Sequence, residues 1–279
     1  MCSILNSTIG LVPMSEIVEK AGNGEQSLPT IRQTATTVEG ALALKEPIVY
    51  FYTVGVDSED RIVLIKSRQM LNDKFLGRMI PEHYTAVAEM SDRLERLNLL
   101  EIEEIKKVND DYTRYFFEIS ISCKLLLKEE LVQKVLELAK KGAENIALSF
   151  DASTIDTLDK DAKVRLKELR EAGFKIMLEG IENAPIRVLT EIDADFIRLD
   201  FRFYKQRTPS QTKQVEALIK LAKARGMKVV CAYIKHMGEA KFMINLGADI
   251  AEGYAFGEPR RSIYEAMEER RQLKGLDGK

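Results

Sequence analysis

Residues 174–200 constrain the fold more than any other part of the chain. They hold two short apolar runs, 174–178 and 196–199, which end in the carboxylates Glu179 and Asp200 and are joined by a short helical piece. Two strands connected through a helix lie parallel and side by side, so both carboxylates are expected at the carboxyl ends of the strands. If the chain repeats this unit, its functional site is a ring of strand ends.

The same alternation of apolar strand and amphipathic helix recurs along the chain. Further strands are predicted at 115–122, 146–150, 227–233 and 249–256, with helical spacing of apolar residues between them. Glycines that suit a left-handed helix end close three of the helices, at Gly173, Gly226 and Gly247. An α/β fold of the TIM-like (β/α) barrel type is the most economical arrangement, and an open doubly wound sheet is the alternative.

The amino-terminal part predicts how the barrel opens. Residues 1–37 are mixed and contain turn-forming residues, which indicates an arm or capping segment before a barrel at 38–279. An apolar run at 48–54 and a second run at 61–68 flank a polar turn, so the barrel is expected to open with an antiparallel β-hairpin. One long helix is predicted for 82–107.

Charge and cysteine usage exclude several kinds of partner. The 42 Lys and Arg residues nearly balance the 44 Asp and Glu residues, so there is no basic field for nucleic acid or for an anionic membrane. Three cysteines form no CxxC pair, and two histidines are too few for a zinc-type cluster. No apolar run approaches the ~20 residues of a membrane helix and no signal segment is present, so a cytoplasmic protein is expected.

Four segments together carry a family resemblance: MIPEHYTAVAE, FEISIS, FIRLD and GADIAEGYAFGEP. They resemble the EAL domain family, whose members are barrel enzymes that hydrolyse cyclic di-GMP with two divalent metals. Their order and spacing extend the resemblance over residues 38–271, and it implies the same barrel fold.

Most positions where this resemblance would place metal ligands or catalytic groups carry other residues. Glutamates are replaced by Leu64, Ser149 and Ala232, an asparagine by Ser120, a lysine by Arg198 and a glutamine by Glu252, while Glu179 keeps one carboxylate of an adjacent pair. Two divalent cations about 4 Å apart need several anionic oxygens around them. The resemblance therefore implies a degenerate member that is not an enzyme, with no catalytic residues, metal or cofactor.

Four carboxylates at predicted strand ends leave a second interpretation open. Converging side chains there could hold a single Mg²⁺ or Ca²⁺, and the four are Asp151, Glu179, Asp200 and Glu252. The competing and preferred interpretation is that these acids cap the following helices or pair with nearby arginines.

The preferred functional hypothesis is a catalytically inactive regulatory protein that acts through protein contacts in signalling, with a homodimer as a further candidate. Its expected surfaces are the arm 1–37 and the helix 82–107. The second hypothesis is a cyclic di-GMP receptor without hydrolysis, and the third is a phosphodiesterase with a non-standard metal site. The candidate ligand-binding residues are Arg68 and Arg198 for phosphates, Tyr233 and Tyr254 for a guanine, and the mouth carboxylates Glu179, Asp200 and Glu252, of which Glu179 and Glu252 would oppose an anion.

Overall fold

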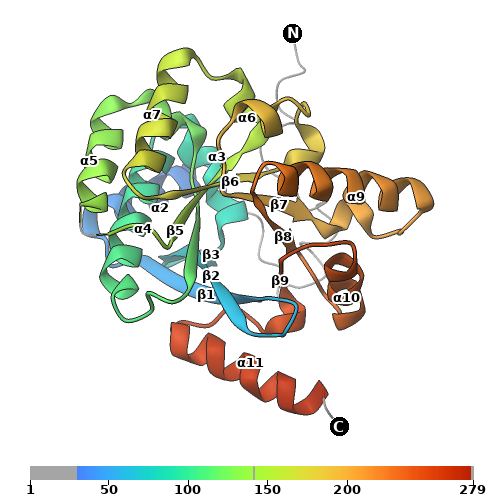
Figure 1. The fold of residues 1–279 in the computed structure, drawn as a ribbon. Coiled ribbons are helices and arrows are strands. Elements are labelled where there is room, and N and C mark those ends of the chain that lie inside the picture. The colour runs from blue at the N-terminus through green and yellow to red at the C-terminus, as the bar shows by residue number, and fades with distance from the viewer. Residues whose placement is uncertain (1–29, 141, 278–279) are drawn as a thin grey trace.

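The computed structural model describes residues 30–140 and 142–277, and its centre is a closed (β/α) barrel (Figure 1). Strands β2 and β4 to β9 run parallel, while β1 is antiparallel to both of its neighbours, β2 and β9, and closes the barrel. The short β3 pairs with the far end of β2. The predicted TIM-like barrel that opens with an antiparallel hairpin is thus confirmed. The strands are β1 Ile48–Val56, β2 Ile62–Asp73, β3 Gly77–Met79, β4 Phe116–Ser120, β5 Ile146–Asp151, β6 Lys175–Glu179, β7 Phe196–Asp200, β8 Lys228–Ala232 and β9 Ile250–Glu252.

Helices follow the strands and cover the outside of the barrel (Figure 1). None of the helices in the described ranges combines the length and the apolar content that a bilayer span requires. The α-helices are α2 Ile31–Leu44, α3 Pro81–Met90, α4 Leu94–Asn109, α5 Glu129–Ala139, α6 Ala152–Thr157, α7 Lys160–Glu171, α8 Val188–Glu191, α9 Pro209–Ala224, α10 Met237–Asn245 and α11 Ile263–Asp277. Short 3-10 helices are η1 Cys123–Leu127, η2 Ile181–Asn183, η3 Phe201–Tyr204 and η4 Tyr254–Phe256.

The prediction of one long helix over 82–107 is wrong, because this segment forms the two helices α3 and α4. Between them Asp92 adopts a left-handed backbone with φ 54°, which a right-handed helix cannot accommodate. The inner side of α4 is buried in the core through Leu97, Ile102 and Ile105. Only the outer side of this segment is therefore available to a partner.

Helix α2 joins the predicted arm to the barrel. It begins with a capping box between Thr30 and Gln33 and buries Val38 and Ala41 in a small second core with β2, β3, α3 and α4. The predicted boundary between residues 37 and 38 falls inside this helix. Residues 1–29 of the predicted arm lie outside the described residues.

Side chains inside the barrel form two layers, because strand residues two apart face the same side of a sheet. The first layer is apolar and consists of Leu64, Phe116, Ala147, Met177, Phe196, Val230 and Ile250. Two residues further along the same strands, the second layer consists of Lys66, Glu118, Ser149, Glu179, Arg198, Ala232 and Glu252. The barrel interior is therefore apolar in the first layer and mostly charged or polar in the second layer, which lies nearer the carboxyl ends of the strands.

Candidate functional site

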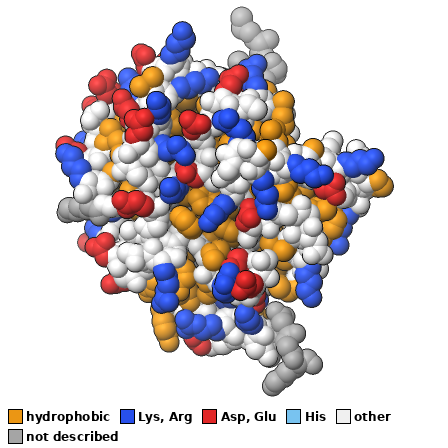
Figure 2. Space-filling view, in the orientation of Figure 1, with side chains coloured by type: hydrophobic (Ala, Val, Ile, Leu, Met, Phe, Trp, Pro, Cys, Tyr) orange, Lys and Arg blue, Asp and Glu red, His pale blue; other side chains and the backbone are white. Residues whose placement is uncertain are grey.

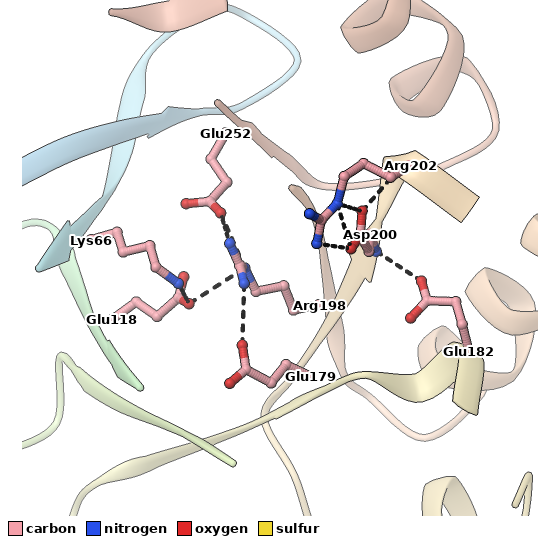
Figure 3. A network of polar contacts seen from close by, with 8 residues as sticks. All are labelled: Lys66, Glu118, Glu179, Glu182, Arg198, Asp200, Arg202 and Glu252. Carbon is pink, nitrogen blue, oxygen red and sulfur yellow. Dashed lines mark hydrogen bonds and ion pairs between the residues drawn. The ribbon is translucent and has the colours of Figure 1, made fainter. Parts of the chain in front are cut away.

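Five charged side chains of the second layer form a connected network, which we call the barrel ion cluster: Lys66, Glu118, Glu179, Arg198 and Glu252 (Figure 3). Arg198 Nε donates to Glu252 at 3.0 Å, and Arg198 Nη2 donates to the same carboxylate. Its Nη1 donates to Glu179 at 3.1 Å, and its Nε lies 3.4 Å from Glu118. Lys66 Nζ donates to Glu118. Two cations therefore face three carboxylates in the middle of the barrel.

Burial and mutual charge shift the pKa values of this cluster in different directions. Burial disfavours the ionised form of Glu252, but the charges of Arg198 and Lys66 outweigh it and hold the pKa of Glu252 below its usual value. Burial raises the pKa of Glu118, and the same two cations offset this effect only in part. Burial opposes the charge on Arg198, yet Glu252 and Glu118 raise its pKa well above the usual value. The arginine is thus fixed as a cation among the carboxylates.

One side of the cluster leaves polar atoms unsatisfied. Within the described residues, the buried atoms Glu118 Oε2 and Ser149 Oγ have no hydrogen-bond partner. They belong to the neighbouring strands β4 and β5, whose registered residues include the pair Ser120 and Ser149. A buried polar atom without a partner costs about 1 to 3 kcal/mol, so this side of the cluster is stabilised less well than the side around Arg198.

A second polar group lies beside the cluster at the barrel mouth (Figure 3). Asp200 accepts from Arg202 Nη2 at 2.6 Å, and Glu182 accepts from the backbone N–H of Asp200 at 2.7 Å. The guanidinium carbon of Arg202 lies 3.8 Å from the ring centroid of Tyr233, and that of Arg198 lies 5.1 Å away. Tyr233 has a left-handed backbone with φ 63°, and its ring is held against two arginines.

The rim of the mouth carries partly exposed aromatic side chains. Phe203, Tyr233 and Tyr254 follow β7, β8 and β9, and they are 46%, 41% and 43% exposed. Large aromatic surfaces beside arginines are common in recognition sites, so the rim is a candidate recognition surface. Figure 2 shows the other end of the barrel, viewed onto the amino ends of the parallel strands.

The structure brings together only part of the predicted site. Glu179, Arg198 and Glu252 are in direct contact, and Asp200 and Tyr233 join them through Arg202. Tyr254 lies on the rim. Arg68 instead donates to both oxygens of Glu82 in the first turn of α3, at 2.7 and 2.9 Å. The hydrogen bonds of Arg68 within the described residues therefore go to the outer helix α3.

Sequence reasoning missed five members of this site, namely Lys66, Glu118, Glu182, Arg202 and Phe203. The signal for the first two was present, since each lies two residues after an inward-facing apolar residue of its strand. A charged residue at an inward position of a barrel strand needs an opposite charge inside the barrel. Counting inward positions would therefore have paired Lys66 with Glu118.

The four strand-end carboxylates do not converge on one point. Asp151 caps α6 by accepting from the backbone N–H of Thr154 at 2.8 Å, and Asp200 is paired with Arg202. Glu179 and Glu252 both contact Arg198. In the described ranges, no group of three or more His, Cys, Asp or Glu side chains is placed to hold a metal ion. The interpretation as caps and ion pairs describes these carboxylates.

We expect the free energy of unfolding to fall as the pH rises from about 4.5 to about 7. Burial raises the pKa of Glu182 from 4.5 to about 7, and burial raises that of Glu101, which accepts from Ser67 Oγ at 2.6 Å, to about 7 as well. Between these pH values the folded protein retains two protons that the unfolded chain has released. Their contribution to stability is therefore complete below pH 4.5 and lost above pH 7, with a slope of at most ~1.4 kcal/mol per pH unit for each group.

Urea denaturation at pH 5 and pH 7.5 measures this decline. Glu182→Gln should remove the part of it that Glu182 contributes, because glutamine stays neutral over the whole range. Glu137→Gln on the exposed side of α5 is the matched control and should leave the decline unchanged. An equal decline in the Glu182→Gln variant and the parent protein would contradict the assignment.

A protein-family model matches most of the chain. The model described as "EAL domain" matches residues 36–259. Among curated proteins, the probable cyclic di-GMP phosphodiesterase PdeA of Escherichia coli (strain K12) is 21% identical over 151 residues, which are 52% of this chain and 21% of the relative. The chain thus spans about a fifth of the length of that relative.

Solved structures of low sequence identity share the fold. The EAL enzyme Bd1971 in its cAMP- and cyclic-di-GMP-bound form has a TM-score of 0.72 at 20% identity, over 88% of this chain and 69% of its own. The PaMucR phosphodiesterase in complex with c-di-GMP has a TM-score of 0.75 at 14% identity, over 83% of this chain and 99% of its own. At such identities the likeness concerns the fold alone.

Proposed function

Since this chain belongs to the EAL domain family, whose model matches residues 36–259, we propose that it is a signalling protein of that family which does not hydrolyse cyclic di-GMP and acts through contacts with another protein. The observation that carries the proposal is the barrel ion cluster. At the end of the barrel where the family resemblance would place two divalent metals, this chain places the fixed cations Lys66 and Arg198.

The electrostatics of the cluster oppose a divalent metal. An incoming cation would need Glu118, Glu179 and Glu252 as ligands, but these carboxylates already contact Arg198 or Lys66. Two unit charges about 4 Å apart repel by roughly 4 kcal/mol at an effective dielectric constant of 20, and a divalent ion doubles this repulsion. Leu64, Ser149 and Ala232 add no anionic ligand. The residues present do not fit two divalent metals.

The rim of the mouth supports a role in protein contacts. Phe203, Tyr233 and Tyr254 expose aromatic surface on three consecutive loops, and aromatic residues with arginine are enriched at protein interfaces. Arg202 is already oriented by Asp200, so the rim is preorganised and loses little conformational entropy on binding.

A cyclic di-GMP receptor is the second candidate, and the stacking of Arg202 on Tyr233 favours it. A guanine could stack on the exposed part of this tyrosine ring, and relatives such as PaMucR have been solved with c-di-GMP bound. The arginines best suited to hold phosphates are engaged elsewhere, since Arg198 contacts three carboxylates and Arg68 contacts Glu82. Because a phosphate would have to displace these carboxylates, we place the receptor second to the protein-contact role.

We expect no linear product when the purified protein is incubated with cyclic di-GMP and Mg²⁺, Mn²⁺ or Ca²⁺. Chromatography of the nucleotide measures hydrolysis, with an active phosphodiesterase run in parallel, and calorimetric titration measures binding. Product formation above the metal-only blank would refute the loss of hydrolysis. Saturable heat without product, abolished by Tyr233→Ala, would replace the protein-contact proposal by the receptor.

The protein-contact role predicts a specific adduct at the rim. A photo-crosslinking amino acid placed at Tyr233 should capture a discrete partner in the native cell, while the same group placed at the exposed Lys220 on α9 should not. Substituting both Phe203 and Tyr254 by serine should weaken the Tyr233 adduct. Identical adducts from the two crosslinking positions would show that the rim has no selective partner.

A further inference from the structure

A pocket of about 400 Å³ lies at the end of the barrel opposite the barrel ion cluster. Its walls are the tip of the hairpin between β1 and β2, the turn before β4, and helix α11. Ile62 in its wall is the first residue of β2, and Tyr115 directly precedes β4. The pocket therefore opens at the amino ends of the parallel strands, away from the site described above.

The lining of this pocket is strongly cationic. Five of its side chains carry a positive charge and a single one carries a negative charge: Arg61, Arg114, Arg270, Arg271 and Lys274 against Asp60. Asp60 accepts from Arg270 Nη2 at 2.7 Å and lies 3.4 Å from Lys274 Nζ. Arg270 is only 2% exposed, so the ion pair of Arg270 with Asp60 forms the buried base of the pocket.

The remaining arginines of the pocket, Arg61, Arg114 and Arg271, are held by weak contacts. Arg61 pairs with Asp57 and Glu59 of its own turn, and Arg271 pairs with Glu268 one turn earlier on α11. These carboxylates do not line the pocket, and exposed ion pairs are worth only ~0 to 1 kcal/mol, so an incoming anion can compete for the arginines. Within the described chain Arg114 makes no ion pair, and its guanidinium carbon lies 5.3 Å from the ring centroid of Tyr115.

We propose that this pocket binds a small phosphorylated ligand, with Arg61, Arg114 and Arg271 as its phosphate contacts. Planar guanidinium groups match phosphate oxygens in pairs, and a phosphate dianion relieves the mutual repulsion of the three cations. A volume of about 400 Å³ lies within the range of small-molecule sites. Tyr115 and Ile62 supply an apolar wall for the organic part of a phosphate ester.

Calorimetric titration at about 20 mM salt, where charges are screened least, tests this site with two probes. Inorganic pyrophosphate represents a free phosphate ligand, and adenosine 5′-monophosphate represents a phosphate ester. We expect saturable binding of at least one probe at one site per chain, weakened at least tenfold in the Arg114→Ala/Arg271→Ala variant. Binding of the ester alone would assign an organic phosphate, and binding of pyrophosphate alone would assign an inorganic one.

Two controls keep the test decisive. Lys220→Ala removes an exposed cation from α9, far along the chain from the pocket, and should change the affinity less than twofold. Arg114→Gln alters one exposed turn residue without touching α11, so it should weaken binding even if the double variant does not fold. No saturable heat from either probe, or an equal loss in the Lys220→Ala variant, would overturn the proposal. None of these outcomes depends on whether the protein hydrolyses or binds cyclic di-GMP at the barrel mouth.

Discussion

Replacing Arg198 by methionine is expected to lower the free energy of unfolding by about 3 to 5 kcal/mol at pH 7. The arginine is buried and contacts Glu118, Glu179 and Glu252, so its removal leaves three carboxylates with Lys66 as the only nearby cation of the barrel ion cluster. Methionine fills much of the space but offers no charge. Chemical denaturation with the parent protein in parallel measures the loss.

The pH dependence of this loss separates charge from packing. In the parent protein the pKa of Glu252 is lowered, so its contribution is present above the unfolded pKa of about 4.5 and lost below it. In the variant the buried carboxylates are expected to have raised pKa values, which remove stability as the pH rises. The difference between the two proteins should therefore shrink from pH 7 to pH 4. Arg198→Lys keeps the charge and should lose less than Arg198→Met. A loss below about 1 kcal/mol at pH 7 would show that the cluster is not a stabilising unit.

A second large effect is expected for Gly253→Ala, which should lower the free energy of unfolding by more than about 3 kcal/mol. Gly253 has φ 142°, and a Cβ at this position would overlap the backbone nitrogen and oxygen of Ile234. The two loops meet here through hydrogen bonds from Ile234 N–H to Glu252 and from Ala255 N–H to Ile234, at 3.0 and 3.1 Å. No side-chain rotation relieves a clash of the new Cβ with the backbone of Ile234, so the loops after β8 and β9 must separate.

Gly40→Ala is the matched control for this substitution. Gly40 lies inside α2, and a Cβ there meets no atom within 4 Å. Alanine in a helix interior is favoured over glycine by roughly 0.5 to 1 kcal/mol, so this variant should be slightly more stable than the parent. Thermal and urea denaturation of both variants measure the contrast. A Gly253→Ala protein as stable as Gly40→Ala would mean that the two loops do not approach each other as closely as described.

The fold was accessible from the sequence because its signal is repeated. Each strand and helix unit is short and locally consistent, and glycine ends such as Gly173 and Gly226 mark the boundaries. The break between α3 and α4 was not predicted, because the apolar spacing continues across 82–107 and the left-handed Asp92 has no strong residue signature. Aspartate tolerates this conformation without requiring it.

The site was only partly accessible for a different reason. Contacts such as that of Arg198 with Glu252 join residues 54 positions apart, and only the closure of the barrel brings them together. The sequence placed both residues at strand ends, but it did not reveal which charges pair. Arg68 is the opposite case. Its position in the sequence predicted a side chain at the barrel mouth, but its guanidinium pairs with Glu82 on the neighbouring helix.

The barrel ion cluster also bears on how such a chain can evolve. A descendant that bound two metals would have to lose the positive charges of Lys66 and Arg198 and gain carboxylates at second-layer positions such as Ser149 and Ala232. Losing a cation first would leave buried carboxylates without a counter-charge, and gaining a carboxylate first would add another unpaired charge. Either intermediate is less stable than its parent by an amount comparable to a large part of the stability of a typical domain. If the proposed loss of hydrolysis is correct, a change to a two-metal site by single substitutions would therefore pass through a less stable protein at its first step.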